Sequence, residues 1–192
     1  GKIIFITAKH VIGASGESIT LSLVSGPTIN VPLKNQFPIS GLDATVVIID
    51  GPINITPLVV SDKLPVLATP LTVWGFPVTD KSTRPTITSR TGLYLGSPNA
   101  IDDGYSLLYG ASTQVGFSGG PILDGNGKVV GMHGRSESRR AASGQSERTG
   151  NALGIPISSI IASILKSSGS AASAIDQKAL QDQASAASIS KV

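Results

Sequence analysis

The sequence contains no cysteine, and only one tryptophan and three tyrosines, among its 192 residues. The absence of cysteine excludes a disulfide framework, a thiol nucleophile and any cysteine-based metal site. So few large aromatic side chains weaken the case for the stacking platforms of a sugar-binding β-sandwich. No apolar run approaches the roughly 18 residues needed to cross a bilayer. Gly1 opens directly into a strand-like segment, so no signal peptide is predicted.

Charged residues are also few. The chain carries 15 Lys and Arg against 12 Asp and Glu, a formal net charge of +3. Its basic residues are scattered apart from a cluster at Arg135, Arg139 and Arg140, so nucleic acid is not a predicted partner. Hydrophobic residues are plentiful, at 40%, and there are 22 Gly and 12 Pro. This composition predicts a buried core and a β-rich fold with many tight turns, in one domain or two small lobes.

Short apolar runs separated by Gly, Pro, Asn and Asp predict two series of β-strands. The first series comprises residues 3–7, 19–24, 29–33 and 44–49, and the second residues 71–75, 86–95, 105–110, 121–124 and 128–133. The sequence Asp-Gly-Asn-Gly at residues 124–127 predicts a hairpin turn between the last two strands. Regularly spaced short strands indicate an all-β barrel or sandwich. The boundary between the two series is expected near residues 62–69.

The pattern changes after residue 135. Residues 136–150 are rich in Ser, Arg, Gly and Glu without apolar periodicity, which predicts a mobile surface loop in preference to a binding element. Isoleucines at helical spacing after Pro156 predict a helix over residues 158–166. Residues 169–192 are rich in Ala and Ser, and we expect either a flexible tail there or a weak helix around residues 175–184.

The segment Gly-Phe-Ser-Gly-Gly-Pro at residues 116–121 is the first candidate for chemistry. A serine nucleophile needs an exposed hydroxyl on a tight turn and backbone N–H groups aimed at the developing oxyanion. Flanking glycines permit the backbone angles of such a turn. The N–H groups of Gly116 and Ser118 would then form the oxyanion hole. Taken alone, a Gly-Ser-Gly segment is more often a bare turn.

A serine nucleophile also needs a general base, and the base needs a carboxylate that holds its tautomer. His10 is one of only two histidines, and it stands where an apolar strand runs into a polar turn. Asp43 immediately precedes the β-branched strand at residues 44–49. Considered singly, His10 would be a structural or exposed residue, and Asp43 a turn or capping residue.

Together these segments carry a family resemblance. Residues 7–10 (TAKH), 42–47 (LDATVV) and 116–121 (GFSGGP) resemble, in that order, the three signature blocks of trypsin-like serine peptidases. Residues 73–77 (VWGFP) resemble the strand that opens the second barrel in bacterial members of that family. The resemblance covers about residues 2–168. Three ordered blocks are far more specific than any one of them.

The resemblance implies an all-β fold of two antiparallel six-stranded β-barrels, with a catalytic cleft between them and a closing C-terminal helix. The N-terminal lobe, residues 1–65, would carry His10 and Asp43, and the C-terminal lobe, residues 66–168, would carry Ser118. Ser118 would attack the scissile carbonyl while His10 takes its proton and Asp43 orients the imidazole. No metal or cofactor is implied. The partner would be a protein or peptide substrate, and an exported location, periplasmic or extracellular, is implied as well.

Two features depart from the family pattern. Digestive members carry Asp just before the nucleophile, where it pairs with a newly cleaved N-terminus, and Phe117 occupies that place here. This chain is therefore not expected to use that activation switch. Family members also have a strand ahead of the histidine block, for which Gly1 leaves no room. Either the first barrel is missing its N-terminal strand or the chain lacks its natural start.

Substrate preference is read from four positions. Ser112 stands six residues before the nucleophile, where trypsin has Asp, so a preference for Lys or Arg is not expected. His133, followed by Gly134, stands where glutamyl endopeptidases carry a pocket histidine, and Thr113 stands where they have a hydroxyl residue. The resemblance thus implies a pocket that holds an acidic side chain by charge-assisted hydrogen bonds. The equally weighted alternative is that His133 is a partly buried strand residue bonded to its neighbours.

The sequence therefore predicts a serine endopeptidase with the triad His10, Asp43 and Ser118. Three other readings remain. The chain could be an inactive pseudo-peptidase that binds peptides or proteins, or a quality-control protein that depends on a further recognition domain. A β-sandwich lectin or adhesin would fit the strands but would leave the ordered triad unexplained.

Overall fold

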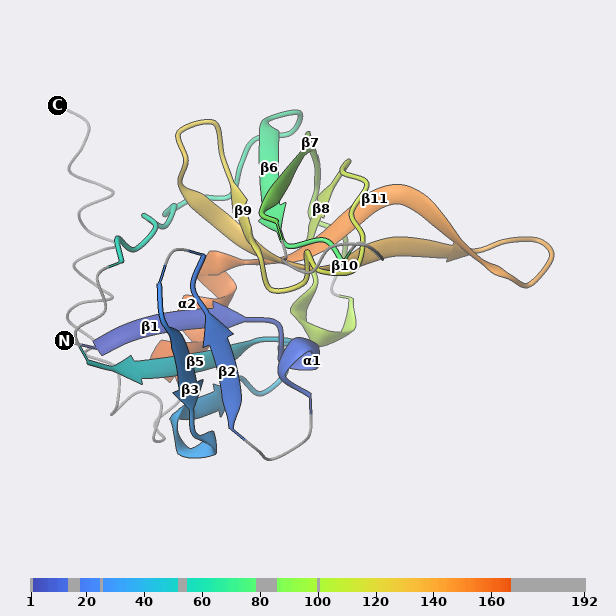
Figure 1. Ribbon diagram of the computed structural model, residues 1–192. Coiled ribbons are helices and arrows are strands. Elements are labelled where there is room, and N and C mark those ends of the chain that lie inside the picture. The colour runs from blue at the N-terminus through green and yellow to red at the C-terminus, as the bar shows by residue number, and fades with distance from the viewer. Residues whose placement is uncertain are drawn as a thin grey trace, which may run out of the picture.

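The computed structural model describes residues 2–13, 18–24, 26–51, 55–78, 86–99 and 101–166. Within these residues the strands form one closed barrel, a three-stranded sheet and a two-stranded hairpin (Figure 1). The predicted tail at residues 169–192 lies outside the described residues.

The N-terminal lobe consists of two small antiparallel sheets. β1 (Lys2–Thr7), β5 (Thr45–Asp50) and β4 (Gln36–Pro38) form one sheet, with β5 in the centre. β2 (Ile19–Ser22) pairs with β3 (Thr28–Val31) in a separate hairpin. A 3₁₀ turn, η1 (Leu33–Asn35), follows β3 and leads directly into β4.

The central strand β5 is buried on both faces, as its β-branched sequence predicted. Because side chains alternate along a strand, its residues divide between two clusters. Val47 and Ile49 pack with Val31 of the β2–β3 hairpin. Val46 and Ile48 belong to a larger core shared with the second lobe. The hairpin and the second lobe thus lie on opposite faces of this strand.

The two sheets of the N-terminal lobe do not close into the six-stranded barrel that the resemblance implied. A barrel requires every strand to be paired on both sides. In the described residues, β1 and β4 are the two edges of their sheet, and β2 pairs only with β3. The structure therefore shows one of the two predicted barrels, in the C-terminal lobe.

Six strands of the C-terminal lobe form that closed barrel, in the order β10-β11-β8-β7-β6-β9. They are β6 (Pro70–Gly75), β7 (Thr88–Gly96), β8 (Leu107–Tyr109), β9 (Pro121–Leu123), β10 (Val129–Arg140) and β11 (Ser146–Pro156). The barrel interior is apolar, with Leu71, Val73 and Ile122 fully buried. At the predicted turn between β9 and β10, the Asp124 carboxylate accepts the N–H groups of Asn126 and Lys128, each at 2.9 Å.

The β10–β11 hairpin corrects one sequence prediction. Residues 136–150 form no irregular loop, because the two strands stay paired as far as Arg140 and Ser146. This arm projects well beyond the barrel in Figure 1. Its cross-strand support is polar, since Thr149 and Asn151 both donate to the Glu137 carboxylate, at 2.6 and 3.0 Å. Apolar periodicity could not indicate these strands, because backbone pairing and polar side chains hold them together.

The C-terminal helix closes the seam between the lobes. α2 (Ile157–Lys166) begins one residue earlier than predicted and buries Ile157, Ile160 and Ile164. These side chains join a core that includes Ala44 of the first lobe and Ile155 of β11. Full burial of such a side chain contributes about 1.5–3 kcal/mol. Among the described helices, none is long and apolar enough to cross a membrane.

Candidate active site

Ser118 lies on a glycine-rich loop that is fixed to two strands of the barrel. The Gly119 N–H donates to the His133 carbonyl and the His133 N–H donates to the Gly120 carbonyl, both at 2.8 Å. Gly119 has a φ of 81°, and a Cβ on Gly120 would overlap the Trp74 carbonyl of β6. Side chains at these two glycines would therefore push the loop away from its supports. The result is a half-buried serine on a tightly held backbone.

The turn before Ser118 leaves two backbone donors free. The Phe117 N–H closes the turn on the Gln114 carbonyl at 3.2 Å, and the Gly116 carbonyl accepts the Phe76 N–H at 2.8 Å. Within the part of the chain that the structure describes, the N–H groups of Gly116 and Ser118 donate no hydrogen bond. Two unpaired N–H groups beside a serine hydroxyl suit an anionic acceptor.

The Phe117 side chain holds this turn by packing into the protein interior. Its side chain is fully buried, and its ring meets His133 edge-on with centroids 6.5 Å apart. The position next to the serine is therefore held by apolar packing.

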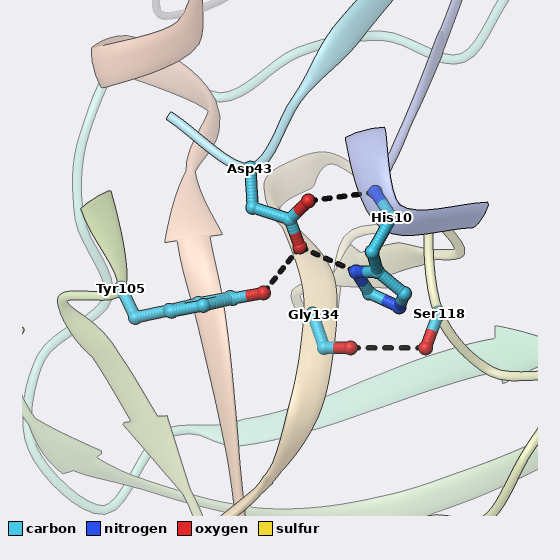
Figure 2. Close-up of polar contacts among 5 residues, drawn as sticks. All are labelled: His10, Asp43, Tyr105, Ser118 and Gly134. Atoms are coloured by element: carbon cyan, nitrogen blue, oxygen red, sulfur yellow. Dashed lines mark hydrogen bonds and ion pairs between the residues drawn. The ribbon is translucent and has the colours of Figure 1, made fainter. Parts of the chain in front are cut away.

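His10 and Asp43 are joined by two hydrogen bonds (Figure 2). His10 lies on α1 (Lys9–Ile12), a single helical turn that follows β1, and Asp43 lies just before β5. The imidazole Nδ1 is 2.5 Å from the Asp43 Oδ2, and the His10 backbone N–H donates to Oδ1 at 2.9 Å. The Asp43 side chain is 9% exposed and that of His10 is 49% exposed. The pair thus buries its carboxylate and leaves the imidazole accessible.

A third donor reaches Asp43 from the second lobe. The hydroxyl of Tyr105, a buried side chain, donates to the Asp43 Oδ2 (Figure 2). Burial acts to raise the pKa of Asp43, but the hydrogen bonds from Tyr105 and His10 outweigh it and hold the pKa below its usual value. Burial, and next the bond to Asp43, raise the pKa of Tyr105. From the sequence, Tyr105 was predicted only as part of a strand. Its contact with Asp43 was not predicted, because 62 positions separate the two residues.

The structure brings Ser118 to the other side of the imidazole without bonding it there. The Ser118 hydroxyl donates to the Gly134 carbonyl at 3.0 Å. In Figure 2 the second imidazole nitrogen of His10 points toward the Ser118 side chain.

The four predicted pocket residues lie on two segments beside this loop. His133 is 2% exposed, and its Nδ1 is 2.7 Å from the Tyr109 hydroxyl. Burial, with a smaller contribution from the charge of His10, lowers the pKa of His133 to about 4. Thr113 is buried and its hydroxyl lies 3.2 Å from that of Ser136, whereas Ser112 is exposed. These contacts are those of the alternative reading, in which His133 is bonded to its neighbours.

Gly134, the fourth pocket candidate, serves the site in another way. Its carbonyl accepts the Ser118 hydroxyl, and a Cβ on it would overlap the Tyr105 ring.

In the described part of the chain, no group of three or more His, Asp or Glu side chains could hold a metal ion.

Known structures share this fold. A variant of the HtrA-type protease AlgW with a decapeptide has 18% sequence identity and a TM-score of 0.65, over 86% of this chain and 49% of that chain. The same variant with a tripeptide has 18% sequence identity and a TM-score of 0.64, over 86% of this chain and 53% of that chain. The MamO protease domain from Magnetospirillum magneticum has 17% sequence identity and a TM-score of 0.59, over 83% of this chain and 81% of that chain. This chain thus spans about half the length of the AlgW chains.

The sequence comparison is more specific than the structural likeness, which at these identities shows the fold alone. No protein with a curated description matches the sequence. A family model described as the trypsin-like peptidase domain matches residues 1–132, which include His10, Asp43 and Ser118. The resemblance predicted from the sequence is confirmed, and the chain belongs to the trypsin-like peptidase domain family.

Proposed function

We propose that this chain is a serine endopeptidase, which hydrolyses peptide bonds through an acyl-enzyme formed on Ser118. The observation that carries the proposal is the hydrogen-bonded His10–Asp43 pair, whose second imidazole nitrogen points toward the Ser118 side chain. The free N–H groups of Gly116 and Ser118 lie on the same loop as the hydroxyl. Base, nucleophile and anion donors are the parts that acyl transfer needs.

The mechanism follows from the tautomer of His10. Nδ1–H donates to the Asp43 carboxylate, so the other imidazole nitrogen carries a lone pair and acts as the base. The Ser118 hydroxyl rotates from the Gly134 carbonyl to this nitrogen, attacks the scissile carbonyl and gives up its proton. A positioned base of this kind contributes about 10²–10⁴-fold. His10 then protonates the leaving amine, and water releases the acyl group by the same path in reverse.

A fluorophosphonate probe tests the proposal directly. We expect covalent labelling of the folded protein, with the adduct located on Ser118 by mass spectrometry of the digested protein. Heat-unfolded protein is the control, since an unassembled serine is a poor nucleophile. Internal fragments from an unfolded protein substrate would establish endopeptidase action. Folded protein that takes no label would refute the proposal.

Gly116→Ala is expected to lower the labelling rate about 10²–10³-fold, the usual effect of losing one oxyanion donor. Gly116 has a φ of 100°, and an added Cβ would overlap the Phe76 carbonyl, so the turn must move and carry its N–H with it. Gly127→Ala is the matched control, because Gly127 has a φ of 75° with open space around it. Equal labelling rates in the two variants would show that the Gly116 N–H does not contribute to the oxyanion hole.

We further propose that Ser112, Thr113 and His133 favour an acidic residue before the scissile bond. If Tyr109 donates to Nδ1 of a neutral His133, the other ring nitrogen carries a hydrogen that can bond a carboxylate. With a pKa of about 4, His133 stays neutral at the pH of most assays.

A peptide pair that differs only in Glu or Gln before the scissile bond tests this preference. We expect Glu to be cleaved with the higher kcat/KM, and the ratio to stay flat between about pH 6 and 8. The ratio should fall toward one only as the pH approaches about 4, where the Glu side chain of the substrate itself gains a proton. A ratio near one would exclude His133 as the group that recognises the substrate side chain.

One observation favours a second candidate, an inactive peptide-binding protein. The Ser118 hydroxyl is bonded to the Gly134 carbonyl and, among the described contacts, not to His10. If this bond persists when a peptide is present, the serine is not activated. Peptide binding without labelling, detected by calorimetry, would establish this second candidate.

A further inference from the structure

We propose that Tyr105 is a positioning residue of this site: from the second lobe, its hydroxyl holds the Asp43 carboxylate in the orientation that receives the His10 imidazole. The inference rests on the proposed function, because it assigns Tyr105 a part in the same reaction. It adds a fourth side chain to the predicted triad of His10, Asp43 and Ser118.

The hydrogen bonds of Asp43 carry the argument. Oδ1 accepts the His10 backbone N–H, and Oδ2 accepts both the imidazole Nδ1–H and the Tyr105 hydroxyl. With three donors on two oxygens, the carboxylate cannot rotate without breaking a bond to a charged group, which is worth more than a neutral one. The side chain is only 9% exposed, so water has little access to replace a lost donor. Tyr105 therefore completes the set that fixes this carboxylate.

The backbone around Tyr105 holds the same turn. The Asp43 N–H donates to the Asp103 carbonyl at 2.9 Å, within the 3₁₀ turn η2 (Asp102–Gly104). Asp103 has a φ of 66°, a conformation uncommon outside glycine. Gly104 lies against Leu42, whose side chain a Cβ would overlap. Residues 103–105 thus hold Asp43 by main chain and side chain together, across the seam between the lobes.

The Tyr105 ring is fixed in turn by β10. Gly134 leaves the space that the ring occupies, since a Cβ there would overlap the ring and lie 2.6 Å from the hydroxyl oxygen. The Arg135 guanidinium lies 4.6 Å from the ring centroid. Gly134 also accepts the Ser118 hydroxyl. One residue of β10 therefore bonds the nucleophile and makes room for the donor to Asp43.

The charges near this bond are consistent with a permanent donor. His10 and Tyr105 bond to Asp43, Asp103 lies beside it, and Arg135 faces the Tyr105 ring. Burial and the bond to Asp43 raise the pKa of Tyr105, so the phenol stays protonated at the pH of most assays. The hydroxyl therefore donates to Asp43 throughout, and in doing so it stabilises the ionised carboxylate.

Tyr105→Phe removes this donor and keeps the ring. We expect kcat/KM to fall on the order of tenfold, the effect of one hydrogen bond to a charged group. The loss should fall on kcat, with KM unchanged, because Tyr105 acts on Asp43 and not on the substrate. The acidic limb of the rate–pH profile should move to higher pH, since a carboxylate with one donor fewer is more basic and stabilises the positively charged imidazole of His10 more strongly. Tyr94→Phe is the matched control, because Tyr94 is also buried and loses only its bond to Ser97.

A second readout does not depend on turnover. The proton shared by His10 and Asp43 should give a far-downfield NMR resonance, because short charged hydrogen bonds deshield their protons. We expect this resonance to shift in Tyr105→Phe and to stay in place in Tyr94→Phe. Incorporating 3-fluorotyrosine at position 105 makes the hydroxyl a stronger donor. The resonance and the acidic limb should then each shift in the direction opposite to the shift seen in Tyr105→Phe.

The outcomes separate this inference from the proposed function. A wild-type protein that takes no fluorophosphonate label refutes the serine peptidase, and the NMR comparison still decides whether Tyr105 orients Asp43. A Tyr105→Phe protein with wild-type kcat/KM, acidic limb and resonance overturns the inference, whatever the wild-type activity. Equal losses in Tyr105→Phe and Tyr94→Phe would also overturn it, since that result marks a general effect of a lost buried hydroxyl.

Discussion

Replacing Ser118 by alanine is expected to abolish covalent labelling and peptide hydrolysis while the fold remains intact. Loss of the nucleophile alone lowers kcat about 10⁶-fold in a well-characterised serine peptidase. The structural loss is small by comparison. The Ser118 hydroxyl makes one neutral hydrogen bond, to the Gly134 carbonyl at 3.0 Å, and such bonds contribute about 0.5–1.5 kcal/mol. The two backbone bonds that link the loop to His133 do not involve this side chain.

Urea unfolding and kcat/KM, measured on the same preparations, check both halves of this expectation. Ser61→Ala is the control, because the Ser61 hydroxyl also donates to a backbone carbonyl at 3.0 Å, that of Lys63, and in addition accepts the Lys63 N–H at 3.3 Å. The two variants should lose similar, small amounts of unfolding free energy, and only Ser118→Ala should lose activity. Hydrolysis by Ser118→Ala within tenfold of the wild-type rate would show that another group is the nucleophile.

Elements with a strong local pattern were predicted well from the sequence. β5 was predicted because its five successive residues from Thr45 to Ile49 are all β-branched, and in the structure all five are buried. α2 was recognised because its isoleucines recur at helical spacing. β4 and α1 were missed, since segments of three and four residues are too short to show a period. The outer part of the β10–β11 hairpin was missed because its stabilising contacts are polar.

Closure of a sheet could not be predicted in the same way. Strand pairing depends on contacts between residues far apart in sequence, and the run of strands alone fits either a barrel or a sandwich. The expectation of two barrels came from the family resemblance. The structure shows β1 as an edge of its sheet in the described residues, paired with β5 only. Local patterns thus predicted the strands, while their assembly had to be observed.

The candidate site divides along the same line. His10, Asp43 and Ser118 each lie in a short block beside a strand, so a resemblance in three blocks was enough to select them. Tyr105 has no such block, and its role depends on a contact across the seam between the lobes. The burial of His133 depends likewise on Tyr109, which is 24 positions away. Residues that orient others are defined by packing, and packing is the part that one sequence does not display.

Asp43→Asn is expected to lower kcat about 10⁴-fold, as the corresponding change does in a well-characterised serine peptidase. The structure supplies the reason. Asp43 accepts three hydrogen bonds on two oxygens, from the His10 N–H, the His10 Nδ1–H and the Tyr105 hydroxyl. An amide has one oxygen. If its NH₂ faces Nδ1, His10 must carry its hydrogen on the other nitrogen and cannot accept the Ser118 proton. If the NH₂ instead faces the His10 backbone N–H, two hydrogen-bond donors face each other and neither has an acceptor.

Stability gives a second measure of the same substitution. The pKa of Asp43 lies below its usual 3.8 in the folded protein, because the bonds from Tyr105 and His10 outweigh burial, which acts to raise it. The ionised carboxylate therefore contributes stability that is fully present above pH 3.8 and is lost as the pH falls through the folded-state value. The unfolding free energies of wild type and Asp43→Asn should differ most near neutral pH and converge in acid. Asp50→Asn is the matched control, with the same charge change at the exposed end of β5. A gap that persists unchanged into acid would show that Asp43 acts through packing and not through its charge.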